Sequence, residues 1–264
     1  MTGLFRSELR KIFTTRLWWG LLLGLVLTWA ALSVLQGVAA GRSAGNAAPS
    51  PGLDDPAVLR SVYTGGLGIA YIFTLAFGVI AMAGEYRHQT ITATALASPR
   101  RSRVVLAKLG AVALAGLGYG VAGVLAGVVG GASVIAARGA KVDLLGDGVP
   151  RALISAAVAV ALWAVVGLGV GTLIRNQIVA LLVSIGLAWI AEPIIALVLN
   201  VTHVGAVAKF LPSQATSALV SPPTDSGGIT IDLLPWWGGA LVLLGYAVLA
   251  GALGAGLTLR RDIT

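Results

Sequence analysis

The chain has 264 residues, of which 57% are hydrophobic and 11% are charged, and its formal net charge at pH 7 is +8. A soluble domain carries roughly 25% charged residues, so this composition cannot cover a water-facing surface and excludes an ordinary soluble enzyme. The absence of cysteine excludes disulfides, thiol nucleophiles and cysteine-based metal sites.

Residues 1–16 are predicted to form an amphipathic helix. Its apolar side chains fall on one half of the helix and its basic ones on the other, namely Leu4, Phe5, Leu9, Ile12 and Phe13 against Arg6, Arg10 and Lys11. Glu8 intrudes on the apolar half. Such a helix lies in the headgroup plane of a bilayer. It acts as a surface anchor, as an elbow that also contacts a cytoplasmic partner, or as both.

Six stretches of the chain are long and apolar enough to cross a bilayer, which takes roughly 20 residues. They are residues 17–41, 61–84, 109–137, 152–174, 178–200 and 235–259. Lipid offers no partner for a bare backbone amide, so continuous apolar runs of this length predict helices. We therefore expect an all-α polytopic membrane protein with six transmembrane helices in a single domain. The third run is longer than one crossing needs and should tilt, kink or project from the bilayer.

The basic residues indicate the orientation of the spans, because cytoplasmic segments carry an excess of lysine and arginine. With the N-terminus inside, the inner segments hold twelve of the 18 basic residues: Arg6, Arg10, Lys11, Arg16, Arg87, Arg100, Arg101, Arg103, Lys108, Arg175, Arg260 and Arg261. Both termini are then cytoplasmic. This topology explains the positive charge without a nucleic-acid partner, and we expect none.

The segments between the spans differ in character. The inner turn at residues 175–177 is so short that its two flanking spans should form a tight antiparallel hairpin. Residues 201–234 form an outer loop, in which residues 206–219 are either a short helix that partly re-enters the outer leaflet or an exposed loop. The inner segment 85–103 is too polar to span a bilayer, and a short helix within it would stop at Pro99.

Glu192 is the one acidic residue inside a predicted span. It lies about 21 Å from the inner end of that span, at 1.5 Å per residue, and Pro193 should kink the helix there. A charge near the bilayer centre costs at least about 2.5–3.5 kcal/mol, so Glu192 should face the bundle interior, a cavity or a second subunit, or be protonated. It is either a residue of the substrate path or a hydrogen-bonded acid at a helix contact.

Catalytic and metal-binding constellations are missing from the sequence. The two histidines, His88 and His203, fall on opposite sides of the membrane in this topology, so they cannot share a metal ion. No Gly-Lys pair occurs, which excludes a phosphate-binding loop of the Gly-x-x-x-x-Gly-Lys kind. We expect no catalytic residues and no metal site.

The order of these parts resembles the membrane subunit, or permease, of type-2 ABC exporters. The stretches that carry the likeness are TTRLWW at 14–19, GEYRHQTI at 84–91, PRR at 99–101, VLAK at 105–108, FLP at 210–212 and LRR at 259–261. The likeness covers essentially the whole chain. The segment from Glu85 to Ile91 with the following Pro-Arg-Arg is its most specific part, and the rest is mostly layout.

The resemblance implies an ATP-driven exporter of a hydrophobic or amphipathic substrate in the cell membrane. Two such chains, as a homodimer or with a sister chain, would sit on two cytoplasmic ABC ATPase subunits, which would bind ATP and magnesium, whereas this chain would bind no cofactor and catalyse no reaction. Segment 85–103 would be the coupling segment that contacts the ATPase. The implied contact residues are Glu85, Tyr86, Arg87, Thr90, Ile91, Leu96, Pro99 and Arg100.

Two other functions remain open from the sequence. The first is an ion- or proton-coupled secondary transporter that uses Glu192, although only one buried acid is present and no inverted repeat is apparent. The second is a membrane-embedded enzyme or an assembly scaffold, for which the sequence offers no set of nucleophile, base and metal ligands.

Overall fold

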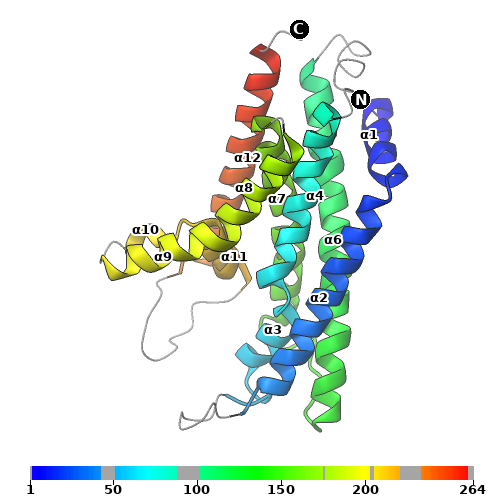
Figure 1. Ribbon diagram of the computed structural model, residues 1–264. Helices are drawn as coiled ribbons and strands as arrows, with labels where there is room; N and C mark the ends of the chain where they lie inside the picture. Colours follow the sequence, from blue (N-terminus) through cyan, green and yellow to red (C-terminus); the bar gives the residue numbers. More distant parts are fainter. Residues whose placement is uncertain are drawn as a thin grey trace.

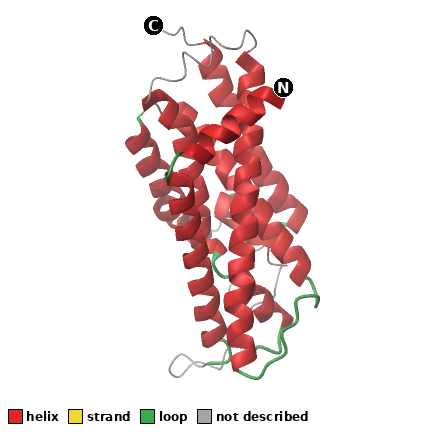
Figure 2. Ribbon diagram, turned by 90° about the vertical axis from the view of Figure 1, so that its right-hand side faces the viewer, coloured by secondary structure: helices red, strands yellow, loops and turns green. Residues whose placement is uncertain are grey.

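A computed structural model of the protein describes residues 2–42, 51–87, 101–174, 176–202, 205–220 and 233–260. These residues form helices and no strand (Figures 1 and 2). The helices are α1 (Thr2–Thr14), α2 (Leu17–Ala39), α3 (Pro56–Thr64), α4 (Leu67–Arg87), α6 (Arg101–Ala137), α7 (Val149–Leu173), α8 (Gln177–Gly186), η1 (Leu187–Ala191), α9 (Glu192–Val201), α10 (Gly205–Ala208), α11 (Pro212–Val220) and α12 (Trp236–Arg260).

Six helical segments within these ranges are long and apolar enough to cross a membrane, which confirms the predicted all-α architecture with six spans. They are Leu17–Ala39, Pro56–Arg87, Arg103–Ala137, Val149–Leu173, Gln177–Leu199 and Trp236–Leu253. Helix α1 lies at the end of the bundle at which α12 finishes (Figure 1).

Helix α7 is the centre of the bundle and packs against α4, α6 and α12. Small residues allow these close contacts. A side chain at Gly167 would collide with the backbone of Leu75 in α4, and one at Gly120 would collide with the backbone of Ala157 in α7. Close backbone approach replaces the hydrophobic effect as the packing force within lipid. Gly20 of α2 differs from these two glycines, because nothing lies within 4 Å of a Cβ placed there.

The second span is divided into α3 and α4 by Gly65 and Gly66, whereas the sequence predicted a continuous helix. Trp29 of α2 causes the break. Its Nε1 donates a hydrogen bond of 3.1 Å to the carbonyl oxygen of Tyr63, and a side chain at Gly66 would collide with the Trp29 ring. Because residue 66 is glycine and has no side chain, the Trp29 ring fits beside it and is fully buried.

Helix α6 begins eight residues before the predicted third span and has 37 residues. Its length is about 55 Å at 1.5 Å per residue, which exceeds the roughly 30 Å of a bilayer core. The uncharged run missed the first turns because they contain Arg101, Arg103 and Lys108. This length agrees with the expectation that the third span tilts, kinks or projects from the bilayer.

The fifth span consists of α8, η1 and α9, and it leans away from the axis of the long helices (Figure 1). The predicted tight hairpin between the fourth and fifth spans is wrong in its packing, because α8 lies mainly against α4 and contacts α7 less. The side chain of Asn176 caps α8 by accepting hydrogen bonds from the backbone N–H groups of Ile178 and Val179. The cap thus satisfies backbone N–H groups that have no partner within α8.

The described part of segment 201–234, which we predicted as an outer loop, contains a buried helix. Helix α11 packs on α12 and α7, and Ala215, Thr216 and Leu219 are among its buried residues. Trp163 of α7 donates a hydrogen bond of 3.0 Å from Nε1 to Thr216 Oγ1. Trp163 lies about 21 Å along α7 from its start at Val149. The expectation of a short re-entering helix fits this depth, and that of an exposed loop does not.

Candidate functional site

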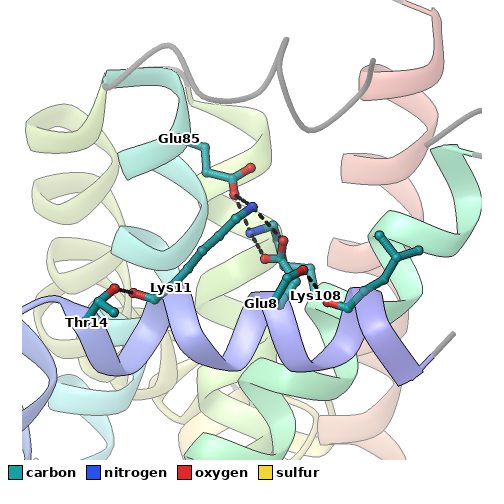
Figure 3. Close-up of polar contacts among 7 residues, drawn as sticks. Glu8, Lys11, Thr14, Glu85 and Lys108 are labelled. Atoms are coloured by element: carbon teal, nitrogen blue, oxygen red, sulfur yellow. Dashed lines mark hydrogen bonds and ion pairs between the residues drawn. The ribbon is translucent and has the colours of Figure 1, made fainter. Parts of the chain in front are cut away.

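Four charged side chains meet where α1, α4 and α6 converge, and we call them the ion-pair ring: Glu8, Lys11, Glu85 and Lys108 (Figure 3). Lys108 Nζ lies 2.6 Å from Glu8 Oε2 and 2.8 Å from Glu85 Oε1. Lys11 Nζ lies 2.6 Å from Glu8 Oε1 and 3.0 Å from Glu85 Oε1. Each lysine thus bridges both carboxylates, and the ring carries no net charge.

The ring is largely withdrawn from solvent. Glu8, Glu85 and Lys108 are buried, and only Lys11 reaches the surface. Glu8 intrudes on the apolar half of α1 because that half lies against the bundle, where Phe5 packs beside Gly110 of α6. Charges in such a place are tolerated when each is paired and hydrogen-bonded, whereas removal of one partner leaves a buried charge uncompensated.

The local electrostatics favour the charged forms on α1. Burial opposes ionisation of Glu8, but its contacts with Lys108 and Lys11 outweigh burial, so the pKa of Glu8 falls below its ordinary value of 4.5. Burial also disfavours the Lys11 cation, but hydrogen bonds and charge interactions with Glu8 and Glu85 prevail and raise the pKa of Lys11 above its ordinary 10.5. Both residues are therefore ionised at neutral pH.

The ring holds the two flanks of the predicted coupling segment. Glu85 lies in the last turn of α4, which ends at Arg87, and Lys108 lies in the second turn of α6, which begins at Arg101. Both side chains bind the same two residues of α1. The interface helix is thereby fastened to both sides of residues 88–100, and movement of either flank relative to α1 would break ion pairs.

The predicted contact residues that the structure describes differ in their burial and contacts. Glu85 is bound within the ring, Tyr86 is half-buried against the main core, and Arg87 is exposed. The remaining predicted residues, Thr90, Ile91, Leu96, Pro99 and Arg100, lie outside the described residues. The sequence interpretation missed Lys11 and Lys108 as partners of Glu85. The one sequence feature that pointed to them was the unexplained acid at position 8 on an apolar helix face.

Glu192 lies in a second polar site, between α9 and α11. It is buried, and its carboxylate accepts a hydrogen bond from the backbone N–H of Ser213 in the first turn of α11. The first backbone N–H groups of a helix have no partner within it, and an acidic group satisfies them and complements the positive end of the helix dipole. Of the two interpretations of Glu192, this arrangement matches the hydrogen-bonded acid at a helix contact.

We expected Pro193 to kink the helix beside Glu192. The structure has a π-helical turn, η1, directly before Glu192 and Pro193. In this turn the N–H of Glu192 donates to the carbonyl oxygen of Leu187. The carbonyl of Ala188 would pair next with residue 193, but proline has no N–H. The hydroxyl of Tyr71 donates to Ala188 instead, at 3.2 Å. Lipid cannot satisfy such a carbonyl, so Tyr71 supplies the donor that the proline lacks.

The Tyr71 ring is held by aromatic packing. It stacks on Trp163 with 4.5 Å between the ring centroids and an interplanar angle of 23°. Trp163 in turn donates to Thr216 of α11. One set of contacts therefore joins α4, α7, α11 and the π turn at the depth where Glu192 caps α11.

No group of three or more acidic or histidine side chains in the described part of the chain is arranged to hold a metal ion. Comparison with known protein families finds no family that matches the chain, and comparison with curated protein sequences finds no matching protein. Any functional assignment must therefore come from the arrangement of the residues themselves.

Proposed function

We propose that the chain is the membrane-spanning permease subunit of an ATP-driven ABC exporter, which moves a hydrophobic or amphipathic substrate out of the cytoplasm or the inner leaflet. Two copies of the chain would form the transmembrane part in the cell membrane, with both termini in the cytoplasm. Two separate ATPase subunits would bind ATP and magnesium beneath them, and this chain would hydrolyse no ATP.

The observation that carries the proposal is the attachment of α1 to both flanks of segment 85–103 through the ion-pair ring. A subunit driven by a soluble ATPase needs a cytoplasmic segment that receives force and a rigid link from that segment to the spans. Glu85 and Lys108 make that link at the ends of α4 and α6, and both helices continue through the bundle. The excess of basic residues at this end fits a cytoplasmic location.

A binding experiment tests the proposal. The full chain is purified with an ABC ATPase from the same genome, and the variants Ile91→Asp and Leu96→Asp are compared with Leu145→Asp. Leu145 is 89% exposed in the connection between α6 and α7, at the other end of the bundle. We expect the first two variants to lose the ATPase and the third to keep it. Retention of the ATPase and of transport by both inner variants would overturn the assignment of the coupling segment.

The side of the membrane is tested separately, and the absence of cysteine makes the chain ready for labelling. Single cysteines at Arg87 and Leu145 should react from opposite sides, with position 87 accessible only from the cytoplasm. Labelling of position 87 from outside would remove the surface on which the ATPase must bind. ATP hydrolysis by the purified chain without a partner would also contradict the proposal.

The alternative, a proton-coupled secondary transporter, depends on Glu192 as a carrier of protons. Its carboxylate has a structural partner at Ser213, and a hydrogen bond to the end of a helix gives it a role that needs no proton transfer. We therefore place the exporter first.

A further inference from the structure

Among the described residues, the end of the bundle that carries the ion-pair ring has more arginines than acidic residues. Both acidic residues described there, Glu8 and Glu85, are bound by lysines. Five arginines at the same end are exposed and make no ion pair or side-chain hydrogen bond in the described part of the chain: Arg6, Arg10, Arg16, Arg87 and Arg103. The ring thus neutralises the acids with lysines and leaves the guanidinium groups available.

Helix α1 presents two of these arginines together. Arg6 and Arg10 are four residues apart, which places them one above the other on a helix. Each lies about 160° around the helix from Glu8, at 100° per residue, so they point away from the bundle. Phe13 follows Arg10 by three residues, and its side chain is 52% exposed beside them. The outward face of α1 therefore combines two cations with an aromatic ring.

The depth of this face is set by the chain that follows. Helix α1 ends at Thr14, and the first span begins at Leu17, with Arg16 between them. The indole of Trp18 donates a hydrogen bond to the carbonyl of Phe13, at 3.2 Å, and Trp19 is 51% exposed. Tryptophan at the end of a span marks the headgroup level of a bilayer. The outward face of α1 is therefore at the height of lipid phosphates.

We propose that the outward face of α1, formed by Arg6, Arg10, Phe13 and the adjacent Arg16, is a binding site for the phosphate groups of anionic phospholipids such as phosphatidylglycerol. The guanidinium group binds phosphate with two parallel hydrogen bonds and is weakly hydrated, which suits it to this contact better than an ammonium. Phe13 inserts at the boundary of the acyl chains. The inference depends on the geometry of α1 and not on the proposed transport function.

The test measures lipid binding by the full chain in detergent. Binding of phosphatidylglycerol and of phosphatidylcholine is titrated by native mass spectrometry for the wild type and for the Arg6→Gln/Arg10→Gln variant. Because each basic residue near an anionic surface contributes about a fivefold gain in affinity, we expect the variant to bind phosphatidylglycerol roughly ten- to thirtyfold more weakly. Its affinity for phosphatidylcholine should not change.

Two further variants separate a specific site from general charge and from misfolding. Arg6→Lys/Arg10→Lys keeps the charge but loses the paired hydrogen bonds, so it should bind phosphatidylglycerol with intermediate affinity. Lys141→Gln removes an exposed charge from the other end of the bundle and should change nothing. Equal affinity of the wild type for the two lipids would overturn the inference. So would loss of ATPase binding in the glutamine variant with lipid binding intact, because the face would then be a protein contact.

Discussion

Lys108 Nζ lies 2.6 Å from Glu8 Oε2, although the two residues are 100 positions apart in the sequence. The contact joins α1 to the start of α6, the longest of the described helices. Because Glu85 binds the same lysine, the ends of α4 and α6 cannot separate without exposing charge to a weakly solvated region. The ion-pair ring therefore makes α1, α4 and α6 one unit at this end of the protein.

Removal of Lys108 should destabilise this unit strongly. In Lys108→Met, two buried carboxylates share only Lys11, and breaking a buried ion pair costs about 3–5 kcal/mol. We expect the unfolding temperature in detergent to fall, and Lys141→Met, which removes an exposed lysine, to leave it unchanged. The double variant Glu8→Gln/Lys108→Met should lose less stability than the sum of the losses in the two single variants. Additive losses would mean that the two side chains do not interact.

The ring also predicts how stability depends on pH. The pKa of Glu8 is lowered by folding, so its contribution is complete above its unfolded value of about 4.5 and is lost as pH falls below that value. The pKa of Lys11 is raised, so its contribution is complete below 10.5 and is lost as pH rises above that value. Chemical unfolding of the wild type and of Glu8→Gln is measured from pH 7 to acid. The difference between them should shrink in acid, and a constant difference would contradict the ionised state of Glu8.

The sequence predicted much of the fold because the bilayer imposes a simple rule on it. Lipid requires long apolar helices, so all six spans were visible as long apolar runs, and the beginning of α2 was predicted at Leu17, where it lies. The structure departs from the predicted helices where contacts between side chains that are distant in the sequence interrupt a helix. The break at Gly66 depends on Trp29, which lies 37 positions earlier, and no local pattern shows that these residues meet.

Of the ion-pair ring, the sequence analysis named Glu85 as a contact residue but not its lysine partners. The resemblance placed the site between α4 and α6, but the ring needs partners from α1, and pairing between distant charges leaves no periodic signature. The same limit applies to Glu192. Its burial followed from its place in an apolar run, whereas its hydrogen bond with Ser213 depends on how α11 folds back into the bundle.

The π turn yields a prediction about hydrogen bonding. Tyr71→Phe removes the donor to the Ala188 carbonyl, and hydrogen bonds between membrane helices contribute about 0.6–1.7 kcal/mol. Pro193→Ala restores a backbone N–H that can reach the same carbonyl, so Tyr71→Phe should cost almost nothing in that background. Tyr246→Phe is the matched control, since its hydroxyl donates to a carbonyl outside the π turn, that of Phe210, at 3.3 Å. The stability of each purified variant is measured by unfolding in denaturing detergent. If Tyr71→Phe lowers stability equally in the wild type and in Pro193→Ala, Tyr71 does not replace the missing N–H of Pro193.

Close packing of α7 on α4 predicts a contrast between two glycines. Gly167→Ala places a methyl group against the Leu75 backbone, and overpacking costs about 1–3 kcal/mol. Gly20→Ala adds the same group where nothing lies within 4 Å. Its effect should stay within about 0.5 kcal/mol, as for other surface positions. Thermal unfolding of the two variants distinguishes them, and similar losses would mean that the helix contact at Gly167 is not tight.

Two substitutions of Glu192 distinguish a structural role for this acid from a role in carrying protons. Glu192→Gln keeps an oxygen that accepts the hydrogen bond from the Ser213 N–H, so the variant should lose about 1 kcal/mol of stability and retain transport. Glu192→Leu removes the acceptor and leaves the N–H buried without a partner, which costs about 1–3 kcal/mol, and should loosen α11 from α9. Transport in vesicles with the ATPase supplied, together with unfolding temperatures, measures both effects. Loss of transport in Glu192→Gln without loss of stability would contradict a purely structural role, because the amide keeps the shape and the acceptor oxygen but neither carries the charge nor exchanges a proton.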